Sequence, residues 1–182
     1  NIVALGSWNR KIFYPQWIMK DVMGLQESDK IEGVFNSEEM DISYRVKGIS
    51  IYPKENSLEI SALEDTDESR NTALSAFLKI TNLLPYTPLK GVGFNFVYTI
   101  DPEDIPFLEG QIKSKELLPE GLDIFKLSYR GKASNFILNI IVEKKETGEW
   151  QATFNFHHPM IGNIKEDYLS ILEEHVNKYF SK

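Results

Sequence analysis

The sequence has no cysteine, which excludes disulfides, thiolate nucleophiles and cysteine-ligated zinc sites. Long apolar runs are also missing, because the longest, residues 136–142, is interrupted by Asn139 and falls far short of the ~20 residues of a membrane span. The first residues lack the charged-then-apolar order of a signal peptide. We therefore expect a cytoplasmic protein with no membrane contact.

Runs of lysine and arginine are absent as well. Of the net charge of −7, residues 1–87 contribute −4 (9 basic minus 13 acidic) and residues 88–182 contribute −3 (11 minus 14). Neither half is therefore basic overall, as proteins that bind nucleic acids or anionic membranes usually are, although a local basic patch could exist within an acidic protein. This charge pattern disfavours nucleic acid as a partner.

Familiar catalytic signatures do not occur. The sequence contains no phosphate-binding loop ending in Lys-Ser or Lys-Thr, no Gly-x-Ser-x-Gly and no His-Glu-x-x-His. Gly91-Val92-Gly93 lacks the third glycine and the following helix of a dinucleotide site. We expect no cofactor and no enzymatic activity.

What the sequence does contain is a repeat. Residues 42–48 read Ile-Ser-Tyr-Arg-Val-Lys-Gly, and residues 127–133, which lie 85 positions later, read Leu-Ser-Tyr-Arg-Gly-Lys-Ala. A strand-like run, a polar turn, a second strand-like run and an amphipathic helix pattern follow each copy. The repeat predicts a single domain, residues 1–182, made of repeat one (1–86) and repeat two (87–182).

Hydrophobic alternation locates the expected elements. The expected strands are residues 2–5, 33–35, 42–46, 49–52, 58–63, 91–98, 124–129, 136–143 and 150–156. The expected helices are residues 15–23, a long one that starts within Glu64–Glu68 and stops at Pro85, and a second long one over 164–180, with an irregular piece near 102–109. Acidic residues at the start of the first long helix are read as caps rather than metal ligands.

The predicted fold class is α+β. An internal duplication of a β-α-(β)-β-β-β-α unit would form a curved antiparallel sheet with long helices packed on one face. The two units would abut edge to edge about a pseudo-two-fold axis, which resembles the duplicated architecture of the TATA-binding-protein-like fold. The opposite, concave face would be left for a partner.

Two segments carry a further resemblance. Residues 3–17, which include Leu-Gly-Ser-Trp-Asn and Tyr-Pro-Gln-Trp, and residues 84–95, Leu-Pro-Tyr-Thr-Pro-Leu-Lys-Gly-Val-Gly-Phe-Asn, resemble an uncharacterised, sporadically distributed bacterial protein family. The resemblance implies a bacterial cytoplasmic protein from a mobile or defence-related gene cluster. It implies no activity.

Aromatic side chains crowd into residues 8–17, next to polar ones. The candidate interaction or ligand residues here are Trp8, Asn9, Arg10, Tyr14 and Trp17, with Phe13 between them. Aromatic rings with polar groups can form a ligand pocket or an interface anchor. The alternative is that they only pack this segment onto the sheet.

The repeated Tyr-Arg pairs are the second candidate. Arg45 and Arg130 could line one groove for an acidic partner, since a guanidinium suits a carboxylate. Alternatively, each pair places one side chain in the core and the other at the surface. His157 and His158 are disfavoured as a metal site, because consecutive side chains of a strand point to opposite faces.

These observations favour a non-enzymatic bacterial protein that acts through protein–protein contacts, as a homo-oligomer. A defence, immunity or antitoxin-type component, such as one against phage, fits that description. The first alternative is a small-ligand or nucleotide sensor with a pocket near Trp8, Asn9, Arg10 and Tyr14. The second is nucleic-acid binding through the concave face of the sheet.

Overall fold

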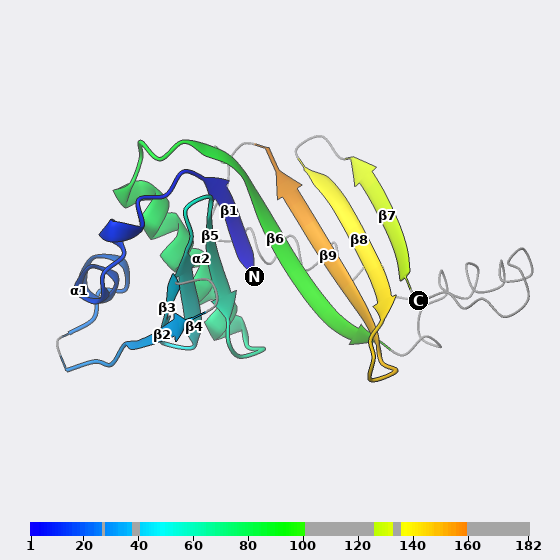
Figure 1. Ribbon diagram of the computed structural model, residues 1–182, viewed down its shortest axis with the longest axis horizontal. Helices are drawn as coiled ribbons and strands as arrows, with labels where there is room; N and C mark the ends of the chain where they lie inside the picture. Colours follow the sequence, from blue (N-terminus) through cyan, green and yellow to red (C-terminus); the bar gives the residue numbers. More distant parts are fainter. Residues whose placement is uncertain (27, 38–40, 101–125, 133–135, 160–182) are drawn as a thin grey trace, which may run out of the picture. The chain divides into compact units, whose positions relative to one another are not determined.

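The structure, a computed structural model, describes residues 1–26, 28–37, 41–100, 126–132 and 136–159 (Figure 1). They form two compact units: 1–94 with 158–159, and 95–157. The first unit contains β1 (Ile2–Gly6), the 3-10 turn η1 (Arg10–Ile12), α1 (Pro15–Trp17), the π-helical turn η2 (Ile18–Val22), β2 (Glu32–Asn36), β3 (Asp41–Val46), β4 (Ile49–Pro53), β5 (Ser57–Ala62) and α2 (Asp67–Leu83). β6 (Leu89–Ile100) runs from the first unit into the second, which adds β7 (Lys126–Lys132), β8 (Ile137–Lys144) and β9 (Trp150–His158).

The described strands follow the hydrogen-bonded order β2-β3-β4-β5-β1-β6-β9-β8-β7. Every pairing with an assigned register is antiparallel, so the predicted antiparallel sheet is confirmed. The strands of the two predicted repeats have the same internal order, β3-β4-β5-β1 in one and β7-β8-β9-β6 in the other. Among the described strands, β2 has no counterpart next to β7, and it pairs with β3.

A tight turn connects β3 with β4 in the first unit. Lys47 and Gly48, with φ of 46° and 73°, form the two-residue connection between β3 and β4. Positive φ at both central residues is the geometry of a type I′ hairpin, whose twist matches that of paired strands. The register between β1 and β6 shifts between Leu5 and Gly6, which is the sign of a β-bulge.

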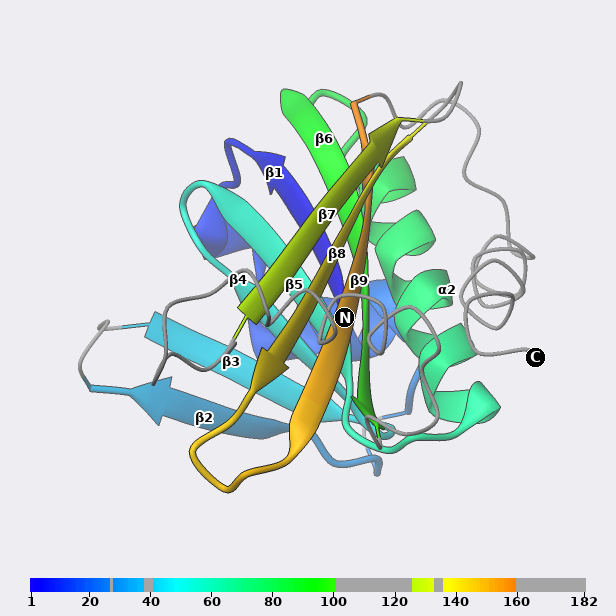
Figure 2. The same ribbon diagram turned by 90° about the vertical axis from the view of Figure 1, so that its right-hand side faces the viewer.

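α2 covers one face of the first unit's strands and contacts β4, β5 and β1 (Figures 1 and 2). Its N-cap is Thr66, whose side chain accepts a hydrogen bond from the Ser69 amide at 3.2 Å. The helix therefore starts at Asp67, at the end of the expected acidic segment, and it stops before Pro85 as predicted. Its buried residues are Ser69, Ala73, Leu74, Ala76, Phe77 and Ile80.

The short helix expected over residues 15–23 is found with a different geometry. Only Pro15–Trp17 is α-helical, and Ile18–Val22 continues as a π-helical turn, in which the Met23 amide donates to the Ile18 carbonyl at 2.9 Å. This wider turn buries Ile18 and Val22 together. Gly24 has a φ of +62°, as expected for the residue that ends a helix.

Alternating burial defines the second unit. Along β9, Ala152, Phe154 and Phe156 are buried, while Thr153 and Asn155 between them are half-buried. Edge-to-face ring pairs join the strands on the apolar side: Phe96 with Phe156 at 5.9 Å and Tyr98 with Phe154 at 6.0 Å. The apolar face thus behaves as a core, as the sequence alternation indicates.

The α+β class is confirmed only in part. The described residues are mostly β, with one α-helix of three residues and one of 17. The predicted second long helix (164–180) and the irregular piece (102–109) lie outside them, so long helices on one sheet face are not established. No helix among the described residues is both long enough and apolar enough to cross a membrane.

Phe77 is the largest of the fully buried side chains of α2, and it is 0% exposed. We expect Phe77→Ala to lower the free energy of unfolding by about 3–5 kcal/mol, since it removes buried apolar area and leaves a cavity. Urea unfolding followed by circular dichroism measures this. Lys79→Ala, on the exposed side of the same helix, is the control and should change it by less than about 0.5 kcal/mol.

Candidate functional site

A pocket of about 370 Å³ lies in the first unit, next to the segment that follows β1. Three stretches of sequence supply its walls: residues 8–13, the start of β3, and the turn between β4 and β5. Its lining residues are Trp8, Asn9, Arg10, Lys11, Phe13, Asp41, Ile42, Tyr44, Pro53 and Glu55. The structure thus brings three of the predicted candidates, Trp8, Asn9 and Arg10, into one site.

Trp8 is fixed in the wall of this pocket. Its indole N–H donates to the Ala4 carbonyl at 3.0 Å, and its backbone amide donates to the Glu55 carbonyl at 3.0 Å. The Trp8 ring meets Phe13 edge to face at 6.1 Å, and Phe13 meets Trp17 in the same way at 5.3 Å. A wall held by two hydrogen bonds and two ring contacts presents a rigid apolar surface to a ligand.

The polar residues of the segment have defined positions as well. Asn9 caps the turn η1, and its side-chain oxygen accepts from the Lys11 amide at 3.2 Å. The Arg10 guanidinium forms an ion pair with Asp41 at the start of β3. This ion pair links the segment to the sheet across the pocket, and the Arg10 side chain stays 48% exposed.

The electrostatic character of the pocket is balanced. Arg10 and Lys11 contribute two positive charges, and Asp41 and Glu55 contribute two negative charges. Asp41 is paired with Arg10, whereas Lys11 and Glu55 form no ion pair with any residue in the described part of the chain. One cation and one anion are therefore available at the rim, beside an apolar wall.

Tyr44 of β3 also lines the pocket. It is buried, at 8% exposure, and this burial raises the pKa of its hydroxyl above the ordinary value. Tyr129, at the corresponding position of the second Tyr-Arg pair, is half-buried, and burial raises its pKa as well. In both pairs the tyrosine is directed inward.

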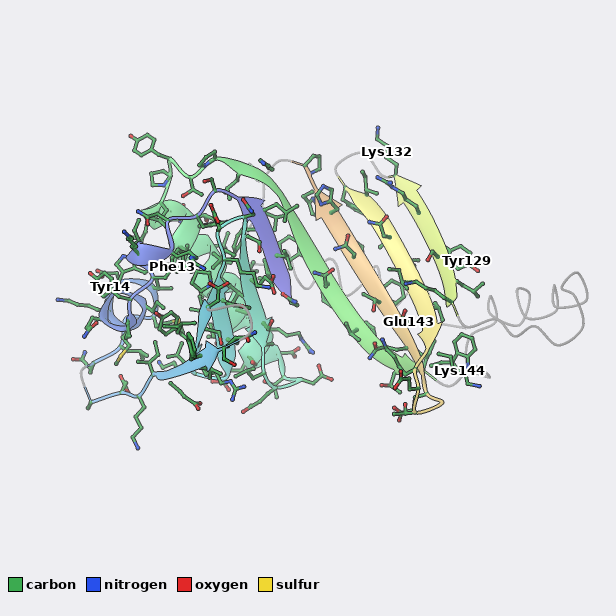
Figure 3. The ribbon with its side chains drawn as sticks, viewed as in Figure 1. Phe13, Tyr14, Tyr129, Lys132, Glu143 and Lys144 are labelled. Atoms are coloured by element: carbon green, nitrogen blue, oxygen red, sulfur yellow. The ribbon has the colours of Figure 1, made fainter. Side chains whose placement is uncertain are left out.

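Tyr14 and Trp17 do not line the pocket. Tyr14 is 50% exposed, and Trp17 is half-buried against Phe13 (Figure 3 labels Phe13 and Tyr14). Packing is seen for Trp8, Phe13 and Trp17, whereas a role of this segment in binding remains a prediction. Trp8 and Phe13 pack the segment onto the sheet and also form the pocket wall, and Tyr14 remains at the surface.

The two arginines of the repeat are both exposed, and they lie in different units. Arg45 lines an open hollow of about 820 Å³ together with Lys30, Glu32, Lys47 and Glu64. Arg130 lies on β7, opposite Asn139 of β8. One groove that both arginines line therefore remains a prediction.

His157 and His158 are consecutive residues of β9, so their side chains lie on opposite faces of the strand. His158 is 3% exposed and meets the Phe94 ring edge to face at 5.8 Å, whereas His157 is half-buried. No three potential metal-ligating side chains gather anywhere in the described ranges. Gly91 and Gly93 lie within β6 and are followed by more strand, not by a helix N-terminus.

Sequence reasoning missed the far side of the pocket: Asp41, Ile42, Tyr44, Pro53 and Glu55. One signal for Tyr44 was present, since Tyr-Arg occurs twice and alternation assigns one of its residues to the inside. No local signal connects Asp41 with Arg10, because 31 residues separate them. Comparison with protein-family models, with curated proteins and with solved structures gave no match for this chain.

The raised pKa of Tyr44 predicts a loss of stability at high pH. In the unfolded chain this hydroxyl ionises near pH 10, whereas the folded protein resists its ionisation. The contribution of Tyr44 is thus fully present below pH ~10 and is lost as the pH rises through the folded pKa. Urea unfolding between pH 8 and pH 11.5 should show a smaller decline for Tyr44→Phe than for the unsubstituted protein. An equally steep decline in both would contradict the assignment.

Proposed function

We propose that this protein binds a small zwitterionic molecule with an apolar part in the pocket of the first unit. The observation that carries the proposal is the composition of the lining: an apolar wall, two cations and two anions. The volume of about 370 Å³ lies within the range of small-molecule sites. An amino acid with an aromatic side chain, or a dipeptide, has this combination of groups.

Each group has a role in this proposal. The Lys11 ammonium and the remaining N–H donors of Arg10 would hold a carboxylate. The Glu55 carboxylate would hold an ammonium group. Trp8 and Tyr44 would contact the apolar part of the ligand, and their burial against the sheet means that they need little reordering on binding.

A nucleotide, the other ligand considered from the sequence, fits this pocket less well. A phosphate requires an excess of positive charge, and the Arg10 guanidinium already bonds Asp41. Glu55 adds a further negative charge at the rim. Repulsion would therefore offset much of the attraction that Lys11 supplies.

We expect L-tryptophan, L-phenylalanine or the dipeptide Ala-Phe to raise the melting temperature and to bind with a measurable heat in calorimetry, whereas AMP does not. Lys11→Met and Glu55→Gln should each weaken binding about tenfold, since each removes one charge-assisted hydrogen bond. Each variant should lose the recognition of a different group of the ligand. Lys11→Met should bind the ligand with an amidated carboxylate as tightly as the ligand with a free carboxylate. Glu55→Gln should bind the ligand with an acetylated amine as tightly as the ligand with a free amine.

Lys79→Met and Glu68→Gln are the matched controls, because they make the same changes at exposed positions of α2. They should leave the dissociation constant unchanged. If none of the three zwitterions raises the melting temperature, or if Lys11→Met and Glu55→Gln bind as tightly as the controls, the proposal is wrong. Tighter binding of AMP that depends on Lys11 but not on Glu55 would favour the nucleotide sensor.

Contact with a protein partner, the leading interpretation of the sequence, is the second candidate. One observation in the first unit favours it: Phe35 and Ile42 are opposite each other on β2 and β3, and they are 58% and 44% exposed. An exposed apolar pair of this kind is a common element of interfaces. Non-enzymatic action and a homo-oligomeric state remain predictions.

A further inference from the structure

β7 has an unusual concentration of positive charge. Its seven residues, Lys-Leu-Ser-Tyr-Arg-Gly-Lys, include three cations and no acid, in a chain whose net charge is −7. Lys126, Arg130 and Lys132 occupy alternate positions and are all exposed. Because side chains alternate along a strand, the three cations project from the same face.

Only one of the three cations has an acidic neighbour on β8. Lys126 is opposite Glu143, and its ammonium lies 3.4 Å from the Glu143 carboxylate. A hydrogen bond from Lys145, and more weakly the charge of Lys126, hold the pKa of Glu143 below its ordinary value. Glu143 is therefore ionised and is already shared between two lysines.

Arg130 and Lys132 have no such neighbour. Arg130 is opposite Asn139 and Lys132 is opposite Ile137, and neither cation forms an ion pair with a residue that the structure describes. Asn139 donates its amide N–H to the Asn155 side chain at 3.1 Å, so it is bonded along the row away from β7. Figure 3 shows Lys132 at the end of β7, with its side chain extended away from the strands.

Among the strands that the structure describes, β7 is at the edge. It is the last strand in the hydrogen-bonded order, and among the described strands it pairs only with β8. A strand in this position presents backbone N–H and C=O groups on its other side. Arg130 and Lys132 are two residues apart and therefore lie about 7 Å from each other along the strand, on one face of it.

In the first unit, the strand that corresponds to β7 has a neighbour on both sides. β3 carries the first Ser-Tyr-Arg segment as β7 carries the second, and β2 pairs antiparallel with β3. In that pairing Glu32 of β2 is directly opposite Arg45. The corresponding position opposite Arg130 is held by none of the described strands.

We propose that the edge of β7 that no described strand occupies binds an extended acidic segment of a partner protein, which adds an antiparallel strand. Its acidic side chains, two residues apart, face Arg130 and Lys132, and the residue between them is apolar and lies on the Leu127 and Tyr129 side. Strand addition supplies affinity through backbone hydrogen bonds and specificity through alternate side chains. Cations on an edge strand repel most strands but select an acidic one.

Two other occupants fit the observations less well. Nucleic acid would use the cations but not the backbone edge, and its charge density would be repelled by a chain of net charge −7. A second copy of this chain would have to present a complementary acidic strand, and the described acidic edge, Glu32 on β2, offers one carboxylate for two cations. Both occupants are outcomes that the experiment can identify.

The test uses the full chain and a fluorescein-labelled peptide, Ser-Val-Glu-Val-Glu-Val-Ser, in fluorescence anisotropy. We expect saturable binding that weakens with added salt, and a loss of about tenfold or more for Arg130→Glu with Lys132→Glu, because attraction becomes repulsion at two sites. Lys90→Glu with Lys144→Glu is the matched control. It makes the same change in net charge at two exposed lysines outside β7, and it should bind as the unsubstituted protein does.

Two further peptides separate strand addition from charge attraction. The peptide with proline in place of the central valine keeps both glutamates but loses a backbone N–H, and it should bind at least tenfold more weakly. The peptide with both glutamates replaced by glutamine should also bind weakly. If the proline peptide binds as tightly as the valine peptide, strand addition is wrong. If Arg130→Glu with Lys132→Glu binds the valine peptide as tightly as Lys90→Glu with Lys144→Glu does, the proposed site is wrong.

The alternatives give distinct results. If a dT12 oligonucleotide displaces the peptide at lower concentration than unlabelled peptide does, the edge is a nucleic-acid surface and the proposal is wrong. If analytical ultracentrifugation without peptide shows a dimer that Arg130→Glu with Lys132→Glu dissociates, a second copy is the occupant and the proposal is again wrong. If the glutamate peptide does not bind to the unsubstituted protein, the proposal is wrong.

Discussion

The pairing of β1 with both β5 and β6 is the constraint on which the first unit depends. β1 has only five residues, yet Ile2 is opposite Ile60 on one side and Phe94 on the other, so it joins the hairpins to the later strand. The chain leaves β1 at Gly6, where an added Cβ would lie 2.9 Å from the Pro88 carbonyl oxygen. Glycine is therefore required at the point where the pocket segment begins. Ala4, within β1, accepts the hydrogen bond that fixes Trp8.

Sequence alternation and turn chemistry were sufficient to locate most strands and α2, because both are local properties of the chain. The positions of Pro15, Gly24 and Pro85 correctly bounded helical segments. The π-helical geometry after Trp17 and the capping role of Thr66 were not predicted, since each depends on competing local hydrogen bonds of similar strength.

The candidate site was predictable only on its near side. Trp8, Asn9 and Arg10 are adjacent in sequence, so composition was enough to nominate them. Their partners on β3 and in the β4–β5 turn depend on strand register, which a single sequence does not specify across 31 residues. The same limit applies to Arg45: its neighbour Glu32 is known only once β2 is paired with β3.

We infer that the repeated Ser-Tyr-Arg segment marks one framework used twice, with the difference between the copies at its edge. In both copies the tyrosine is directed inward and the arginine is exposed on an equivalent strand. In the first copy β2 covers that strand and brings a carboxylate opposite the arginine. In the second, no described strand does so, and Lys132, which forms no ion pair with a described residue, follows two residues later. A cation without an ion pair and a strand edge without a neighbour, both among the described residues, favour an acidic extended segment. The proposed contact therefore depends on the divergence between the copies rather than on their similarity.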